Sequence, residues 1–206
     1  MNHLAHLVLA EPTPASRLGN LIADFLRPAD TAALPAAVRR GVMQHRAVDG
    51  FTDRHPAVHR AIGRLPDHWG WFKGIVVDVY MDHLLARTWD EFDLPPMRAF
   101  VDELNADLLD AVAAAPSEAA DGVRRIAGGD RLMSYRTPAG VEAALRRLTG
   151  IIRERMPTRA VDLVPALADM EALRDDLTDD FRVFFPDLRR FSADWLLAND
   201  APPLRP

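Results

Sequence analysis

The sequence has no cysteine among its 206 residues. This absence excludes disulfide bonds, thiolate nucleophiles and thiolate metal sites, so any metal ion would be held by His, Asp or Glu side chains. No apolar run approaches the roughly 18 residues that a membrane span requires. The start of the chain also lacks the basic and continuously apolar regions of a signal peptide. We therefore expect a soluble cytoplasmic protein that does not associate with membranes.

Positive charge is outnumbered by negative charge. The chain has 25 Lys and Arg residues against 30 Asp and Glu residues, which gives a net charge of −5 and a pI of about 5.8. An acidic balance of this kind argues against a nucleic-acid-binding protein. The length suits one domain, and a hydrophobic content of 49% is ample for one large core. We predict a single domain over residues 1–206.

Apolar residues recur at helical spacing along almost the whole chain. After Ser16, a suitable N-cap, the apolar residues of segment 18–26 follow the period of 3.6 residues. The β-branched run over residues 75–79 could form a buried strand, but its flank favours a helix and no partner strand is visible. The sequence therefore predicts an all-α, single-domain helical bundle. Further helices are predicted over residues 34–50, 55–65, 97–114, 138–156 and 160–185.

A histidine and an aspartate continue one apolar helix stripe. Val38, Val42, His45 and Asp49 fall at i, i+4, i+7 and i+11, so on a helix they point the same way. A core face that ends in an imidazole and a carboxylate indicates a functional site at that end of the helix. The alternative is structural, because Asp49 could simply pair with a neighbouring arginine.

Two further acids interrupt the most apolar run of the chain. Ile75, Asp78, Asp82 and Leu85 form one helical stripe. An isolated carboxylate in an apolar interior protonates or acquires a partner. A divalent cation would satisfy both acids, and His83 would supply a further ligand. The alternative is a structural network that pairs these acids with basic groups inside the core.

Three more polar residues offer the same chemistry from other segments. Asp24 follows Asn20 by one helical turn, and His6 lies near the start of the chain. Histidine and carboxylate ligands without thiolate suit Mn²⁺, Mg²⁺, Fe²⁺ or Zn²⁺, and a metal site that joins several helices is common in bundles. Structural alternatives stay open here too. His6 could be a hydrogen-bonded core histidine, and Asp53 could cap the helix over residues 55–65.

Charge is distributed unevenly along the chain. Between Val38 and Arg64, six arginines are balanced by only two acids. Such charges usually form a solvated helix face, but they could also form a docking surface for an acidic partner or a phosphate group. This arginine patch consists of Arg39, Arg40, Arg46, Arg54, Arg60 and Arg64.

Five short stretches carry most of these polar residues: Asn2-His3-Leu4-Ala5-His6, Gly19-Asn20-Leu21-Ile22-Ala23-Asp24-Phe25, His45-Arg46-Ala47-Val48-Asp49, Thr52-Asp53 and Asp78-Val79-Tyr80-Met81-Asp82-His83-Leu84. In this order they resemble the acyl-carrier-protein phosphodiesterase family, a distant relative of the HD phosphohydrolases. Order and spacing agree over residues 1–90, and the likeness is looser over residues 132–136 and 181–187. The family usually has an aromatic residue at the position of His3, which leaves His6 as the candidate of that motif.

The resemblance implies a metal-dependent phosphodiesterase with an HD-phosphohydrolase-like, all-α fold. Its reaction would remove the 4′-phosphopantetheine arm from the serine of holo acyl carrier protein and return the apo form. Mn²⁺ is the expected ion, with Mg²⁺ or Fe²⁺ as alternatives. Acyl carrier proteins are acidic, so this partner would dock on the arginine patch, and the association would weaken with salt.

A division of roles follows as a hypothesis. Arg46 would bind a non-bridging phosphate oxygen, and His6 or Asp53 would protonate the leaving serine oxygen or orient the water. Two alternatives stay open: a metal phosphohydrolase that acts on a nucleotide or another small phosphodiester, and a non-catalytic helical binding module. The predicted metal ligands are Asp24, His45, Asp49, Asp82 and His83, supported by Asn20 and Asp78.

Overall fold

Helices form almost everywhere that apolar residues recur at helical spacing. The computed structural model describes residues 2–26, 28–158 and 161–199, and none of these residues lies in a β-strand, which confirms the all-α prediction. No helix in this part of the chain is long and apolar enough to cross a membrane. The helices are α1 (His3–Leu9), α2 (Pro14–Ile22), α3 (Pro28–Thr31), α4 (Ala36–Thr52), α5 (Pro56–Arg64), α6 (Phe72–Arg87), α7 (Met97–Ala111), α8 (Ser117–Ala127), α9 (Arg131–Ser134), α10 (Pro138–Arg155), α11 (Ala166–Ala172) and α12 (Arg174–Ala198).

Some helix ends differ from the sequence prediction. The single helix predicted over 160–185 is wrong, because Leu173 leaves helical geometry (φ −101°, ψ 9°) and separates α11 from α12, although the apolar period continues through it. Residues 159 and 160 lie outside the described part of the chain. Thr13 caps α2 in place of Ser16, and His55 caps α5 in place of Asp53. Helix α8 was not predicted.

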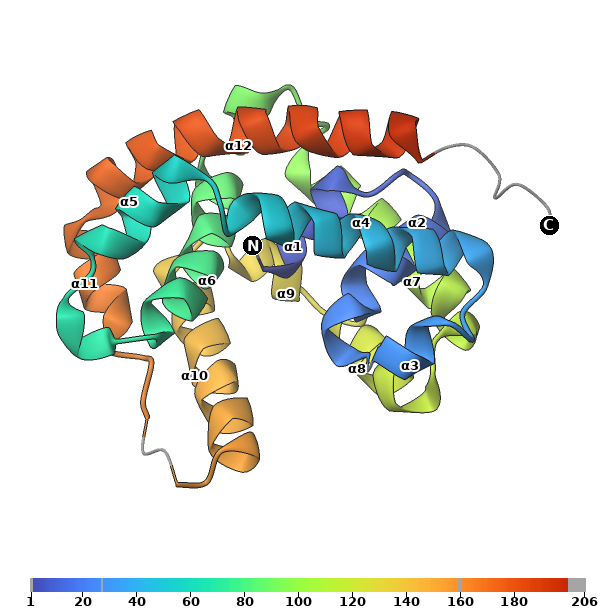
Figure 1. The fold of residues 1–206 in the computed structure, drawn as a ribbon, viewed down its shortest axis with the longest axis horizontal. Coiled ribbons are helices and arrows are strands. Elements are labelled where there is room, and N and C mark those ends of the chain that lie inside the picture. Colours follow the sequence, from blue (N-terminus) through green and yellow to red (C-terminus); the bar gives the residue numbers. More distant parts are fainter. Residues whose placement is uncertain (1, 27, 159–160, 200–206) are drawn as a thin grey trace.

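Helix α12 runs along one side of the molecule and packs on α4 and α5 (Figure 1). On the opposite side of α4, α2 lies between α4 and α7, and α10 packs on α6. The short helix α1 lies in the middle of these elements, in contact with α2, α6 and α12. This arrangement gathers the N-terminal motifs around α1.

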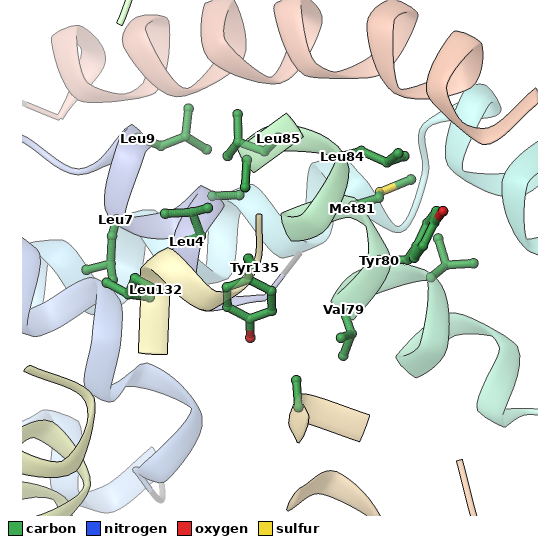
Figure 2. Packing of buried hydrophobic residues seen from close by; sticks show 14 of the residues in the cluster. Leu4, Leu7, Leu9, Val79, Tyr80, Met81, Leu84, Leu85, Leu132 and Tyr135 are labelled. Carbon is green, nitrogen blue, oxygen red and sulfur yellow. The ribbon is translucent and has the colours of Figure 1, made fainter. Parts of the chain in front are cut away.

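The core is built around α1 and α6. Figure 2 shows Leu4, Leu7 and Leu9 of α1 beside the apolar side chains of α6, with Tyr135 close by. Full burial of each such leucine stabilises the fold by about 1.5–3 kcal/mol. The same two helices also carry His6, Asp82 and His83, which are all 1% exposed or less. These polar side chains are therefore held in place by the tightly packed core around them.

A close crossing of α2 and α4 brings their polar residues together. A Cβ atom added at Gly19 would lie 2.1 Å from the Val38 carbonyl oxygen, and one at Gly41 would lie 2.6 Å from the Ser16 carbonyl oxygen. Only glycine permits this approach, because any side chain would push the helices apart. As a result, the Asn20 backbone on α2 comes within hydrogen-bonding distance of His45 on α4.

Candidate active site

Four polar side chains from three segments form one cluster, which we call the histidine–aspartate cluster. His6 comes from α1, Asp24 from the 3₁₀ turn η1 (Ala23–Phe25), and His45 and Asp49 from α4. The His45 Nε2 atom lies 3.2 Å from Asp24 Oδ1 and 3.1 Å from Asp49 Oδ2. The His6 Nε2 atom lies 3.1 Å from Asp49 Oδ1. The structure thus brings together residues that are up to 43 positions apart (His6 and Asp49) in the sequence.

The orientation of His45 follows from its two hydrogen-bonding sides. Its Nδ1 atom lies 2.8 Å from the Asn20 carbonyl oxygen, which can only accept, so Nδ1 carries a proton. Its Nε2 atom then faces both carboxylates. Burial alone would lower the pKa of His45, but the contacts with Asp24 and Asp49 raise it to about 9. The ring is therefore a buried imidazolium at neutral pH, with its second proton between two carboxylates.

The second imidazole of the cluster has the opposite charge state. The rings of His6 and His45 stack with their centroids 3.7 Å apart and an angle of 14° between their planes. Burial and the adjacent His45 charge lower the pKa of His6 to about 4, so it is neutral at pH 7. Burial would raise the pKa of Asp49, but hydrogen bonds from both histidines hold it well below its usual range.

The donor atoms of this cluster have the chemistry and the spacing for a divalent cation. One ligand atom each from His6, His45 and Asp49 lies within 4.8 Å of the others. With both aspartates ionised and only His45 protonated, the cluster carries a net charge of about −1. The contacts with Asp24 and Asp49 stabilise positive charge at His45 Nε2. A divalent cation could replace the second proton of His45 and bind the neutral Nε2 atom.

The cluster opens onto a polar cavity of about 260 Å³, which we call the acidic cavity. Asp24 and Asp49 line it, and Asp53 and Asp78 contribute two further carboxyl groups. Burial raises the pKa of Asp78. Two residues were predicted to support the ligands. Asp78 lines the cavity, whereas Asn20 contacts His45 through its backbone oxygen.

Asp82 and His83 are the two predicted ligands that the structure does not bring into the cluster. The Asp82 carboxylate accepts hydrogen bonds from the Leu4 amide at 2.8 Å and the Ala5 amide at 3.0 Å. The His83 Nδ1 atom lies 2.6 Å from the Tyr135 carbonyl oxygen. Both side chains therefore fasten α6 to neighbouring segments. The prediction took a buried acid to need a cation, but backbone amides satisfy this one.

The predicted catalytic residues occupy different places. Asp53 lines the acidic cavity, and His6 belongs to the histidine–aspartate cluster. Arg46 is exposed and its Nη2 atom donates to Thr31 Oγ1 at 2.9 Å, so it does not line the cavity. The structural alternative for Asp53 is wrong, because His55 caps α5.

Half of the arginine patch is neutralised within the chain. Arg40 pairs with Glu11, while Arg60 and Arg64 both pair with the buried Asp180. The other three members of the patch have no ion pair with a described residue: Arg39, Arg46 and Arg54. The local excess of arginine in the sequence therefore overstates the free positive charge of this surface.

A second cavity next to the cluster was missed by the sequence analysis. This cavity of about 490 Å³, the arginine cavity, is lined by Arg125, Arg131 and Arg147 and shares Asn2 and Leu148 with the acidic cavity. Two sequence signals pointed here. Residues 124–155 contain eight arginines and three acids, and the looser family likeness includes residues 132–136.

The charge state of His45 predicts a pH effect on metal-free protein. The folded protein holds the His45 proton more tightly than the unfolded chain, whose histidines have a pKa near 6.5. This contribution is complete below pH 6.5 and is lost as pH rises through about 9. We expect the free energy of unfolding to fall by on the order of 2 kcal/mol over that window. Urea denaturation in the presence of a chelator would measure it. His45→Gln should lack this slope, and an equal slope in that variant would refute the assignment.

Comparison with known proteins places the chain in a family. The sequence model of the family described as acyl carrier protein phosphodiesterase matches residues 1–188. Curated relatives with this description are 43% identical over 91 residues in Yersinia pestis (44% of this chain, 47% of the relative) and 41% identical over 93 residues in Serratia proteamaculans (45% and 48%). A relative in Pectobacterium atrosepticum is 36% identical over 118 residues (56% and 61%).

The chain thus spans about half the length of the first of these curated relatives. No solved structure matches the chain, so the HD-phosphohydrolase-like fold stays a prediction. The family model, in contrast, covers most of the chain, including all four residues of the histidine–aspartate cluster. The chain belongs to the acyl carrier protein phosphodiesterase family.

Proposed function

We propose that this chain hydrolyses the phosphodiester that joins the 4′-phosphopantetheine arm to the serine of holo acyl carrier protein. The observation that carries the proposal is the buried Nε2 atom of His45, held between the carboxylates of Asp24 and Asp49 in a chain of this family. A proton stabilised between two acids beside a cavity supports a cation site. The names of the relatives support the carrier protein as the substrate.

The proposed cation site differs from the sequence hypothesis in two ligands. Asp82 and His83 are left out because their hydrogen bonds hold other segments, and His6 takes a place in the set with Asp24, His45 and Asp49. Two imidazoles and two carboxylates suit Mn²⁺, with Fe²⁺ or Mg²⁺ as alternatives. A divalent cation bound there would neutralise charge on the phosphodiester and make water more acidic.

Other groups of the protein would orient the ligands and transfer protons at this site. The Asn20 carbonyl oxygen fixes the His45 ring so that Nε2 points to the cluster. Hydrogen bonds of this kind set the tautomer of a metal-binding histidine. Asp53 lines the acidic cavity together with Asp49, so we assign it the proton transfer to or from the serine oxygen. Arg46 is not retained as a phosphate ligand, because it faces Thr31 outside the cavity.

We propose that the acidic carrier protein docks on only part of the arginine patch. Only Arg39, Arg46 and Arg54 keep charge that no described acid neutralises. Complementary charge mainly raises the association rate, so binding should weaken as salt increases.

The proposal is tested by incubating the purified protein with holo acyl carrier protein and Mn²⁺ and following the mass of the carrier. We expect the carrier to lose the mass of the arm, and a chelator to stop the loss. A parallel reaction with bis(4-nitrophenyl) phosphate separates the alternatives. Turnover of that compound without any change in the carrier would favour a small-molecule phosphodiesterase. No turnover of either, with no bound metal, would favour a binding module.

A further inference from the structure

The arginine cavity adjoins the acidic cavity, onto which the histidine–aspartate cluster opens. Residues of α8, α9 and α10 line it, together with His3 and Phe25, whose rings lie 6.1 Å apart. Asn2 and Leu148 line both this cavity and the acidic cavity. A volume of about 490 Å³ is in the range of cavities that hold small organic ligands. A ligand could therefore reach from the cluster into this space.

Four arginines line this cavity, Arg125, Arg131, Arg147 and Arg155, against two acids, Glu118 and Glu154. Arg125, Arg131 and Arg147 come from α8, α9 and α10, and the described residues give none of them an ion pair. Burial, together with the charges of Arg147 and Arg125, lowers the pKa of Arg131. In contrast, Arg40, Arg60 and Arg64 all pair with acids of the chain. An excess of guanidinium groups that form no ion pair with a described acid favours an anionic ligand, and phosphate matches their geometry.

The other wall of the arginine cavity is apolar. Phe25 and Ile151 are large hydrophobic side chains that are 38% and 42% exposed, and both line this cavity. Leu148 and Ile126 continue the same wall. A wall of this kind gains stability when an uncharged chain covers it. The cavity therefore combines an anion-binding side with a surface for an uncharged chain.

The end of the cavity nearest the cluster is polar. Asn2 donates from Nδ2 to the Tyr135 hydroxyl at 2.8 Å. Burial lowers the pKa of His3, the charge of Asp24 raises it, and the charges of His45, Arg131 and Arg147 lower it further. The arginines and the cluster thus face a common junction at Asn2 and His3. A phosphate at this junction would be within reach of the arginines on one side and of the cluster on the other.

We propose that Arg131 and Arg147, assisted by Arg125, bind the phosphate of a phosphate ester whose extended, uncharged chain lies along Phe25, Leu148 and Ile151. The identity of this chain rests on the proposed function, in which it is the 4′-phosphopantetheine arm. These arginines then take the phosphate-binding role that the sequence had assigned to Arg46. The stretch of the chain beyond residue 90 contributes this half of the site.

The test measures binding by calorimetry on metal-free protein, so that it does not depend on catalysis. The probes are 4′-phosphopantetheine, pantetheine without the phosphate, and inorganic phosphate. We expect the wild-type protein to bind 4′-phosphopantetheine at least tenfold more tightly than either of the other two. Arg131→Met and Arg147→Met should each weaken 4′-phosphopantetheine binding by about tenfold or more, because a hydrogen bond to a charged group is lost. Their affinity for pantetheine should not change.

Arg146→Met is the matched control. Arg146 is next to Arg147 on α10 but is 64% exposed and paired with Glu142, so its loss should leave all three affinities unchanged. Arg147→Lys, which keeps the charge but loses the fork, should give an intermediate affinity. Thermal unfolding of each variant checks that the protein stays folded.

Two results would overturn the proposal. Either Arg131→Met and Arg147→Met bind 4′-phosphopantetheine as tightly as wild type, or pantetheine binds as tightly as its phosphate ester. If inorganic phosphate binds as tightly as 4′-phosphopantetheine, the apolar wall has no part in binding and that half of the proposal fails. The outcomes are separable from the proposed function. Binding through the arginines without cleavage of holo carrier protein refutes the function alone, whereas cleavage that is insensitive to both arginine variants refutes this inference alone.

Discussion

Replacement of Asp49 by asparagine is expected to lower the rate at which the carrier protein loses its arm by on the order of 10³-fold. Asp49 is the acid that joins the two histidines, since Oδ1 lies 3.1 Å from His6 Nε2 and Oδ2 lies 3.1 Å from His45 Nε2. Asparagine has nearly the same shape but lacks the charge and one of the two oxygens. It should therefore remove one cation ligand and leave the surrounding fold intact.

Asp49→Asn should change the metal content of the protein more than its thermal stability. The Asp49 side chain is 39% exposed, and the buried His45 keeps Asp24 as a partner when Asp49 is replaced. We expect metal analysis of protein purified without chelator to find about one transition-metal ion per wild-type chain and much less in Asp49→Asn. Metal-free Asp49→Asn should unfold cooperatively but at a somewhat lower temperature than wild type, because His45 loses one of the two carboxylates that stabilise its charge. Asp179→Asn is the control, because Asp179 is 79% exposed on α12 and lies outside both cavities.

Asp24→Asn provides a graded comparison. Asp24 is 51% exposed and contacts His45 alone among the ligands, so its replacement should cost less activity than Asp49→Asn. If Asp49→Asn keeps its metal and its full activity, the cation site is wrongly placed. The same conclusion holds if the wild-type protein has neither bound metal nor a response to added Mn²⁺.

The local part of this site could be predicted from the sequence. His45 and Asp49 lie one turn apart on a helix whose apolar stripe they continue, and helical geometry alone makes such residues neighbours. His6 and Asp24 reach them only through packing, because the crossing of α2 and α4 and the central place of α1 are tertiary features. The family resemblance included His6 and Asp24, but helical periodicity could not predict that they lie beside His45 and Asp49.

The charged residues show where sequence reasoning ends. Arg60 and Arg64 were counted among the unbalanced charges of the arginine patch, yet Asp180, more than a hundred residues away, accepts from both. Arg131 and Arg147 were not among the predicted site residues, yet they line a cavity and form no ion pair with a described acid. Counting charges along the chain cannot show which charges meet, since the partners come from other helices.

Asp82→Ala is expected to lower the free energy of unfolding by about 3–5 kcal/mol, the largest stability effect that we predict. Asp82 is 0% exposed, and its carboxylate accepts hydrogen bonds from the Leu4 and Ala5 amides at the start of α1. Alanine would leave both amides buried without an acceptor and open a small cavity. Asp82→Asn, which keeps the volume and one acceptor oxygen, should cost less than half as much. Urea denaturation of metal-free protein measures both.

The pH dependence of that comparison identifies the charge of Asp82. Burial raises its pKa to about 7 against the hydrogen bonds from Leu4 and Ala5, which favour the ionised form. Because the folded protein holds this proton more tightly than the unfolded chain, whose aspartates have a pKa near 3.8, the contribution is complete below pH 3.8 and is lost as pH rises through about 7. The advantage of wild type over Asp82→Asn should therefore shrink between pH 4 and pH 7.

The same variant decides between a structural and a ligand role for Asp82. Helix α1 carries His6, so an acid that holds the start of α1 also sets the position of a proposed cation ligand. If Asp82 acts through α1, Asp82→Asn should keep its bound metal and lose stability, and its metal affinity should fall only modestly. If Asp82 binds the cation itself, the variant should lose its metal while the metal-free protein remains as stable as wild type. The two hydrogen bonds to α1 favour the first result, since both carboxylate oxygens already have partners.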